Sequence, residues 1–318
     1  MTTEFLPEGA RIGTPENREY LSCIASLERA IANHAILEGM VTLCDEKMRL
    51  HVDLGCAQGI VEPEEALYRR EGESRKDIAI ISRVGKPIAF CVRSLEAENG
   101  RYVATLSRRD AQIRCIRYAM ESLRPGDVIP SRVTHLEPFG AFLDIGCGVA
   151  SLLSVDCISV SRISHPRDRL RPGMNLPVVV KTVDTENGRV YVTLRELLGT
   201  WEENAAGFEV GQTVTGIIRS VEGYGVFVEL APNLAGLAEL RDGCAAELRE
   251  RIGQSVAVYI KSIVPNRMKI KLILIDTCGK ESTPKDLKFY VDPQRTLHLS
   301  RWCYSPADCT RRVETVFD

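Results

Sequence analysis

Two stretches in the middle of this chain share the same landmarks at a constant separation. Each of three landmarks in the first stretch is followed 85 residues later by a residue of the same kind. The pairs are Gly126 and Gly211, Phe139 and Tyr224, and Phe142 and Phe227. Three landmarks in one register are not expected by chance. A repeat of this length is too long for a solenoid unit and has the size of a small independent domain.

Each copy contains about five short runs in which apolar and polar residues alternate, and glycines mark the turns between them. An antiparallel sheet of so few short strands can bury one face only by curling into a closed barrel. The fold class that we predict is therefore mainly β. It consists of tandem five-stranded barrels of the oligonucleotide/oligosaccharide-binding (OB) type, joined by short helices.

A weaker copy precedes these two. Its strand-like runs include Leu50–Gly55 and Pro87–Val92, and Gly100 falls where the later copies have a landmark. A charged insertion over Tyr68–Asp77 interrupts this copy, and we interpret it as a solvated loop. The chain therefore holds three repeats, of which the first is degenerate.

The rest of the chain is read as helices and a tail. Residues 16–36 keep the spacing of one amphipathic helix, which Thr14 and Pro15 start. Trp302 and Tyr304 indicate that the tail docks on another surface, because disordered tails carry few aromatics. The predicted order is a helical segment 1–36, a degenerate first repeat 37–107, a helical linker 108–123, a second repeat 124–195, a linker 196–207, a third repeat 208–276 and a tail 277–318.

The composition is that of an ordinary soluble protein, with 26% charged and 44% hydrophobic residues. No apolar run reaches the roughly 18 residues of a membrane span, and the N-terminus carries no secretory signal. Eleven scattered cysteines indicate reduced thiols, so we expect a cytoplasmic protein without membrane contact. A net charge of −2 argues against broad attraction to phosphate, but it allows a local binding face.

No catalytic pattern is found in the sequence. A glycine-rich phosphate loop, a nucleophile elbow and a His-Glu-x-x-His helix are all missing. His298, Cys303 and Cys309 lie close together in the tail, but their spacings fit none of the usual zinc patterns. We therefore expect no enzyme activity, no metal, no cofactor and no small-molecule substrate.

Several segments of the second copy follow one recognisable pattern. They are Val133–Gly146, Leu152–Leu153, Ile163–Pro166, Leu170–Gly173 and Val183–Arg195. Together they resemble the S1 RNA-binding domain, the repeat of the ribosomal protein S1 family. The resemblance covers residues 37–276 and is strong in the second copy, good in the third and weak in the first. A three-copy chain of this length is similar to the short S1-like proteins of Gram-positive bacteria.

The resemblance implies a set of RNA-binding residues, because S1 domains contact RNA with two aromatics, a His, an Asp and an Arg on one face. In the second copy these positions fall on Phe139, Phe142, Asp184 and Arg189, and in the third on Tyr224, Phe227 and Lys269. The His position falls on Ser154 in the second copy and on Glu239 in the third. The Asp position of the third copy is apolar, near Val264.

The first copy keeps little of this set. Its aromatic positions fall near Met48 and His51, and only Arg101 keeps its residue type. We therefore do not expect this copy to hold RNA by stacking. In the S1 family, amino-terminal copies often dock on the ribosome, and the resemblance implies such a role here.

Side chains along a strand point alternately to its two faces, and this alternation gives a separate argument about Phe142. The alternative is that Phe142 is a core residue. Leu143 and Ile145 point one way, and Phe142 and Asp144 point the other. Because a carboxylate is rarely fully buried, Asp144 is expected at the surface, and Phe142 is predicted to face outward with it. Base stacking on such rings gives about 1–3 kcal/mol per base and tolerates any base.

Two functions remain open. The first is a single-stranded RNA-binding protein, with mRNA as ligand, that acts in translation at the small ribosomal subunit. The second is a protein-interaction or regulatory adaptor with weak RNA affinity, in which the tail and the first copy bind a partner. The replaced positions Ser154 and Glu239 and the acidic balance favour the second. An RNA-processing enzyme is disfavoured, because no catalytic cluster remains unassigned.

Overall fold

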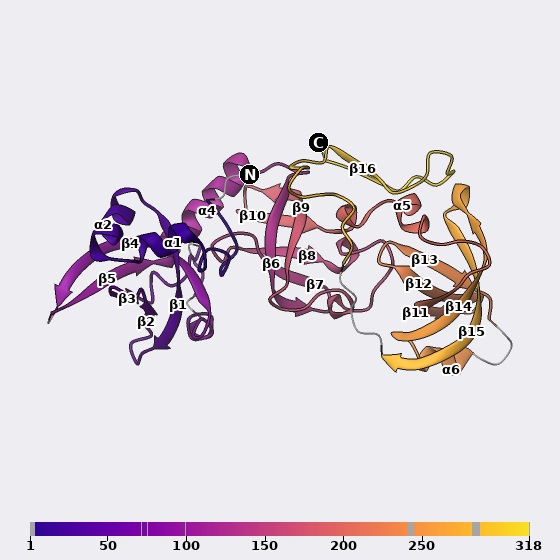
Figure 1. The fold of residues 1–318 in the computed structure, drawn as a ribbon, viewed down its shortest axis with the longest axis horizontal. Helices are drawn as coiled ribbons and strands as arrows, with labels where there is room; N and C mark the ends of the chain where they lie inside the picture. The colour runs from indigo at the N-terminus through magenta and orange to yellow at the C-terminus, as the bar shows by residue number, and fades with distance from the viewer. Residues whose placement is uncertain are drawn as a thin grey trace.

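The computed structural model describes residues 4–70, 72–74, 76–98, 100–240, 245–281 and 287–317. These residues form three closed five-stranded barrels that follow one another along the chain. The barrels lie in a row, with the second between the first and the third (Figure 1). The predicted fold class, mainly β with three tandem OB-type barrels, is confirmed.

The middle barrel has the strand order β10-β8-β7-β6-β9 around its circumference. Its strands are β6 (Val128–Glu137), β7 (Gly140–Asp144), β8 (Ala150–Ser154), β9 (Asn175–Asp184) and β10 (Arg189–Thr193). Neighbours pair antiparallel except for β8 and β10, which run parallel and close the barrel. Alternate residues such as Leu143, Leu153 and Val192 fill the interior, which leaves the intervening residues on the outer face.

The first and third barrels repeat this arrangement. The first contains β1 (Ile36–Cys44), β2 (Leu50–Asp53), β3 (Gln58–Val61), β4 (Pro87–Glu98) and β5 (Arg101–Ser107), with the short helix α3 (Asp77–Ile81) before β4. The third contains β11 (Thr213–Glu222), β12 (Gly225–Ala231), β13 (Leu234–Ala238), β14 (Gln254–Val264) and β15 (Lys269–Glu281), with α6 (Ala245–Glu250) before β14. In both, the third and fifth strands are the parallel pair.

The N-terminal region differs from the single helix that we predicted over residues 16–36. It forms two short helices, α1 (Pro15–Tyr20) and α2 (Ile24–Ala32), with a break between them. The Asn17 side chain explains where α1 is held, because its amide donates to the Glu38 carbonyl at 2.9 Å and accepts from the Glu38 amide at 2.8 Å. This contact fixes α1 on β1, while α2 turns to bury Leu27 in the first barrel's core.

Two helical segments connect the barrels. α4 (Arg108–Ser122) follows β5, and Ser107 caps its start by accepting a hydrogen bond from the Asp110 amide. α5 (Trp201–Ala205) precedes the third barrel and begins with a capping box between Thr200 and Glu203. Both helices start where a hydroxyl-bearing residue satisfies the free amides of the first turn.

The tail crosses from the middle barrel to the third, as the yellow trace in Figure 1 shows. Leu287 and Phe317 pack into the core of the middle barrel, and Trp302 and Tyr304 pack into that of the third. The Tyr304 hydroxyl donates to the Asn233 carbonyl at 2.5 Å. The tail contains two short strands, β16 (Arg301–Cys303) and β17 (Glu314–Val316). The expected docking of the tail therefore takes place on the chain's own barrels.

Asp144 is buried, which contradicts the expectation that it lies at the surface. The N-terminal segment covers it: the Glu8 amide donates to Asp144 at 2.7 Å, and the amides of Gly146 and Gly148 donate at 2.8 and 3.0 Å. Burial raises the pKa of Asp144 to about 7 despite these hydrogen bonds. The strand phase was therefore correct, but a segment distant in sequence covers the outward-facing carboxylate.

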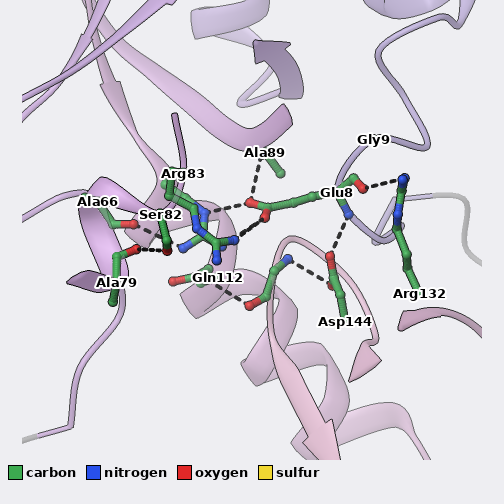
Figure 2. Close-up of polar contacts among 12 residues, drawn as sticks. Glu8, Gly9, Ala66, Ala79, Ser82, Arg83, Ala89, Gln112, Arg132 and Asp144 are labelled. Carbon is green, nitrogen blue, oxygen red and sulfur yellow. Dashed lines mark hydrogen bonds and ion pairs between the residues drawn. The ribbon is translucent and has the colours of Figure 1, made fainter. Parts of the chain in front are cut away.

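The same N-terminal segment joins the first two barrels through a buried ion pair. Figure 2 shows Glu8 between the two barrels, with Arg83 and Ala89 of the first on one side and Asp144 of the second on the other. The Glu8 carboxylate accepts from Arg108 at 2.6 and 3.0 Å and from the Ala89 amide at 3.1 Å. Loss of one partner of such a buried pair costs about 3–5 kcal/mol, so this junction is firmly held.

Candidate nucleic-acid interface

The aromatic pair of the middle barrel lies at one end of its outer face. Phe139 sits in the turn between β6 and β7 with 56% of its surface exposed, and Phe142 is half-buried on β7. Their ring centroids are 6.1 Å apart with the planes at 89°. This edge-to-face arrangement leaves ring surface open, so the predicted pair forms a platform on which bases can stack.

Gly140 explains how the backbone fits beside these rings. A Cβ at this position would lie 2.5 Å from the Leu153 carbonyl oxygen and 3.0 Å from the Ser154 Cα. Only glycine allows β7 to approach β8 this closely at the start of the strand. The close approach sets the position from which Phe139 and Phe142 project.

A row of side chains continues from Phe142 across the barrel. Phe142 pairs with Leu152 on β8, Leu152 pairs with Tyr191 on β10, and Tyr191 pairs with Thr182 on β9. Tyr191 is half-buried, whereas its neighbours Val190 and Val192 are in the core. The sequence analysis did not include Tyr191 among the residues of this face. Strand alternation could have found it, because it lies two residues after Arg189 and thus on the same face.

Arg189 and Asp184 face each other at the start of β10 and the end of β9. Arg189 is exposed, as a phosphate contact requires. Asp184 accepts hydrogen bonds from the Asn187 amide and side chain, both at 2.9 Å, and these bonds lower its pKa. Its carboxylate therefore shapes the turn that presents Arg189.

The position that holds a histidine in S1 domains is Ser154 here, at the end of β8 opposite Gly140. A hydrogen bond from Ser154 lowers the pKa of Asp156, so this hydroxyl serves the local loop. A different histidine, His135, pairs with Phe142 across β6 and β7 and is exposed. Its Nε2 lies 2.7 Å from Glu137. His135 thus puts an imidazole beside the platform from another strand.

The third barrel presents an aromatic pair with the same edge-to-face geometry, but its neighbours differ. Tyr224 is 67% exposed, and its ring centroid is 6.2 Å from that of Phe227 at an interplanar angle of 88°. The row from Phe227 runs through Leu237 to Lys271, which takes the place of Tyr191.

The basic and acidic positions of the third barrel differ as well. Lys269 takes the place of Arg189, and Val264 opposite it takes the place of Asp184. Glu239, at the histidine position, is exposed. This face keeps the stacking pair, but it offers point charges instead of a guanidinium fork.

The first barrel has no aromatic platform at the equivalent positions. Its row contains Leu43, His51, Ile60 and Thr105 in place of His135, Phe142, Leu152 and Tyr191. Both ring nitrogens of His51 are engaged, Nε2 with Asp45 and Nδ1 with Gln58, each at 3.0 Å. The His51 side chain is only 14% exposed, so it offers little ring surface for stacking.

Arg101 does not occupy the basic position that we predicted for the first barrel. By strand register that position belongs to Val103, which pairs with Glu96, whereas Arg101 pairs with Glu98 farther along the hairpin. The hairpin of β4 and β5 is longer than that of β9 and β10, which moves the arginine outward. The first barrel's face therefore has Val103 where the middle barrel presents Arg189, with Glu96 at the position of Asp184.

Neither a metal centre nor a membrane span is found in the described part of the chain. There, no three His, Cys, Asp or Glu side chains gather in a way that could hold a metal ion. His298 of the tail instead places Nδ1 2.8 Å from Asp127. None of the described helices is long and apolar enough to cross a membrane.

Comparisons with known proteins agree with this geometry. Residues 122–195, which contain the middle barrel, match the family model of the S1 RNA binding domain. Small ribosomal subunit protein bS1 of Staphylococcus aureus strain COL is 28% identical over 297 residues, which cover 89% of this chain and 73% of that protein. The bS1 protein of Staphylococcus epidermidis is 32% identical over 212 residues, 62% of this chain and 52% of its own length.

A solved structure also matches the chain, a multidomain protein with nucleic acid binding domains from Streptococcus pneumoniae. It aligns with 76% of this chain and 74% of its own at 15% identity, with a TM-score of 0.24. The resemblance inferred from sequence is confirmed by the family model and by the bS1 relatives. The middle barrel is an S1 RNA-binding domain, and most of the chain is homologous to bS1.

Proposed function

We propose that this protein binds single-stranded RNA through the middle barrel, with the third barrel as a secondary platform. The observation that carries the proposal is the open edge-to-face pair of Phe139 and Phe142 on the barrel face that also carries Arg189. This pair lies within the segment that matches the S1 RNA binding domain. Rings that stack on bases and a guanidinium that pairs with phosphate are the two elements of a single-strand binding face.

The face favours single strands without strong sequence preference. Stacking on Phe139 and Phe142 requires bases that are free of a complementary strand, and it contributes about 1–3 kcal/mol per base for any base. Leu152 and Tyr191 extend the surface across the barrel by strand pairing. Asp184 holds the turn that presents Arg189. We therefore assign affinity to stacking and charge rather than to base-edge recognition.

Translation is the process in which this activity fits best. The relatives that align with most of the chain are named small ribosomal subunit proteins. We accordingly propose mRNA as the ligand, the small ribosomal subunit as the partner and the cytoplasm as the location. On this account the protein is a binding protein and not an enzyme.

The test is a titration of the full chain with a fluorescent RNA of about 12 nucleotides, a length within the range that OB barrels bind. Phe139→Ala combined with Phe142→Ala should weaken binding at least about tenfold, because two stacking surfaces are lost. Tyr102→Ala, which removes an exposed aromatic of the first barrel, is the matched control and should leave affinity unchanged. Unchanged affinity in the folded double variant would contradict the proposal.

A second function, that of a protein-binding adaptor, is favoured by one feature of the first barrel. Its helix α3 exposes Ile78 and Ile81, and Val84 follows them at the surface. The tail does not add to this surface, because Trp302 and Tyr304 are buried against the third barrel. Absence of RNA binding by the wild-type chain at low salt would favour this function over the first.

A further inference from the structure

The turn between β9 and β10 is the place where the middle barrel's RNA face meets the first barrel. Arg189 begins β10 directly after this turn, and Gly188 within it has a positive φ of 51°. A Cβ at Gly188 would lie 3.8 Å from the Arg70 Nη2 and 4.0 Å from the Ile116 Cγ2. Arg70 belongs to the first barrel, in the insertion between β3 and β4, and Ile116 belongs to α4. A guanidinium from one barrel thus lies against the RNA-binding turn of the next.

The charge environment of the turn supports this placement. After the hydrogen bonds from Asn187, the positive charges of Arg189 and Arg70 both lower the pKa of Asp184. Two guanidinium groups therefore act on one carboxylate that Asn187 already engages through two hydrogen bonds. Asp184 and Glu186 give the turn two negative charges, and Arg189 and Arg70 offset them, so Arg70 supplies a second cation at the turn.

The same insertion carries further basic side chains. Arg69 and Lys76 line a cavity of about 410 Å³, together with Ser74 and the carboxylate of Glu73. Arg69 is half-buried and Lys76 is exposed. The insertion that we predicted to be a solvated loop therefore presents cations at two places, the cavity and the turn at Gly188.

A continuous track leads from the aromatic pair to Arg70. Strand pairing places Leu152 and then Tyr191 next to Phe142, and Arg189 lies two residues before Tyr191 on the same face. Adjacent strands are about 4.8 Å apart, so Tyr191 lies roughly 10 Å from Phe142 across the sheet. Beyond Arg189 the track reaches the turn and Arg70. The track thus begins with rings and ends with positive charge.

We propose that Arg70 of the first barrel is part of the middle barrel's RNA site and binds a phosphate of the strand that passes Tyr191 and Arg189. The inference rests on the proposed function and extends the site to a second domain. The first barrel, which lacks a stacking row of its own, takes part through a cation. The junction that Glu8 and Arg108 form holds this barrel against the middle one.

The test compares a long and a short RNA on the full chain. Oligonucleotides of about 15 and about 6 nucleotides are titrated at about 50 to 200 mM salt, where phosphate contacts dominate the salt dependence. Arg70→Ala should weaken the 15-mer about three- to tenfold and reduce the slope of log K against log salt by about 0.7, the value for one lost phosphate contact on a single strand. The 6-mer, which the aromatic pair can hold alone, should bind as before.

Three further variants separate a phosphate contact from a structural role. Arg70→Lys should restore most of the affinity and the slope, because a point charge still attracts phosphate. Arg70→Glu should weaken the 15-mer more than Arg70→Ala does. Arg295→Ala is the control, since Arg295 is an exposed tail arginine whose Nε lies 3.6 Å from Asp292. It should change neither affinity nor slope.

The outcomes distinguish this inference from the proposed function. If Arg70→Ala and Arg70→Glu leave the 15-mer affinity and slope unchanged while the Phe139 and Phe142 double variant abolishes binding, the inference is wrong and the proposed function stands. If Arg70→Lys is as weak as Arg70→Ala at every salt concentration, Arg70 acts by shaping the turn, which also overturns it. If the double variant keeps full affinity for the 6-mer, the proposed function itself fails.

Discussion

The middle and first barrels share a strand order and a pairing register, yet they present very different outer faces. At the same positions the middle barrel carries Phe142 and Tyr191, and the first carries His51 and Thr105. Both interiors are filled mainly by aliphatic side chains, with Phe90 also buried in the first. The comparison teaches that similar interiors form the same barrel while the outward rows differ, and we propose that the outward row determines whether a barrel can stack bases.

The third barrel lies between these two extremes. It keeps the aromatic pair of Tyr224 and Phe227, but lysines replace both Tyr191 and Arg189 of the middle barrel. Lysine attracts phosphate as a point charge and lacks the planar fork that pairs with it in two places. We therefore expect RNA affinity to decrease from the middle barrel to the third and to be negligible on the face of the first.

The largest expected effect compares single aromatic substitutions in the two platforms. Phe142→Ala should weaken binding of a short single-stranded RNA about tenfold, because it removes one stacking surface of the stronger site. Phe227→Ala should cost about two- to fourfold, since the middle platform remains intact. Fluorescence anisotropy at one salt concentration measures both. Equal losses would show that the two barrels contribute equally.

A smaller effect is expected from exchanging the basic residues of the two platforms. Arg189→Lys should weaken binding about threefold, and Lys269→Arg should strengthen it about twofold, because the guanidinium adds bidentate pairing and stacking. The two substitutions preserve charge, so the salt slope should stay constant in both. A change in slope would mean that the geometry of the face had been altered.

The face of the first barrel should respond little to substitution. His51→Ala is expected to change RNA affinity by less than about 1.5-fold, because that side chain is only 14% exposed and offers little ring surface for stacking. The same titration measures this effect. A loss comparable to that of Phe142→Ala would contradict the distinction between the barrels.

The smallest effect on RNA affinity is expected from Glu38, a buried carboxylate that anchors the N-terminal segment on the first barrel. One of its oxygens accepts from the amides of Gly9, Arg11 and Ile12 at 2.8 to 3.0 Å, yet burial raises the pKa of Glu38 to about 7. A raised pKa means that the stability from this group is complete below about pH 4.5 and is lost as the pH rises through about 7.

Glu38→Gln should remove this dependence. The unfolding free energy of the variant relative to wild type should therefore rise between about pH 5 and pH 8, by on the order of 2 kcal/mol. Denaturant unfolding at several pH values measures it, and Glu46→Gln, at an exposed position of the same barrel, is the control. A pH-independent difference would show that Glu38 does not titrate in this range.

Much of the fold could be predicted, because the alternation of apolar and polar residues along each strand determines it. The repeat of Phe139 and Phe142 as Tyr224 and Phe227 located both aromatic pairs, and the structure brings the members of each pair into contact. Tyr191 could have been predicted in the same way, because it lies two residues after Arg189 on one strand and so faces the same side of the sheet. Features of this kind depend on residues that are close in sequence or related by the repeat.

Other features depend on contacts between distant segments, which no local pattern encodes. Asp144 is buried because Glu8 lies over it. Trp302 and Tyr304 of the tail are buried because they pack on the third barrel, where the Tyr304 hydroxyl bonds to the Asn233 carbonyl. The helix α1 is likewise held on β1 by the hydrogen bonds between Asn17 and the Glu38 backbone. Long-range packing decides these details, and it also places Arg70 beside the turn between β9 and β10.

The most direct test of the account is to map photochemical crosslinks between the full chain and a 4-thiouridine-containing single-stranded RNA. The account predicts that most crosslinks fall on the peptides with Phe139, Phe142 and Tyr191. Fewer should fall on those with Tyr224 and Phe227, and none on the β2–β3 face around His51. Crosslinks concentrated on the first barrel's face, or none on the middle barrel, would contradict the claim that the outward row determines where RNA binds.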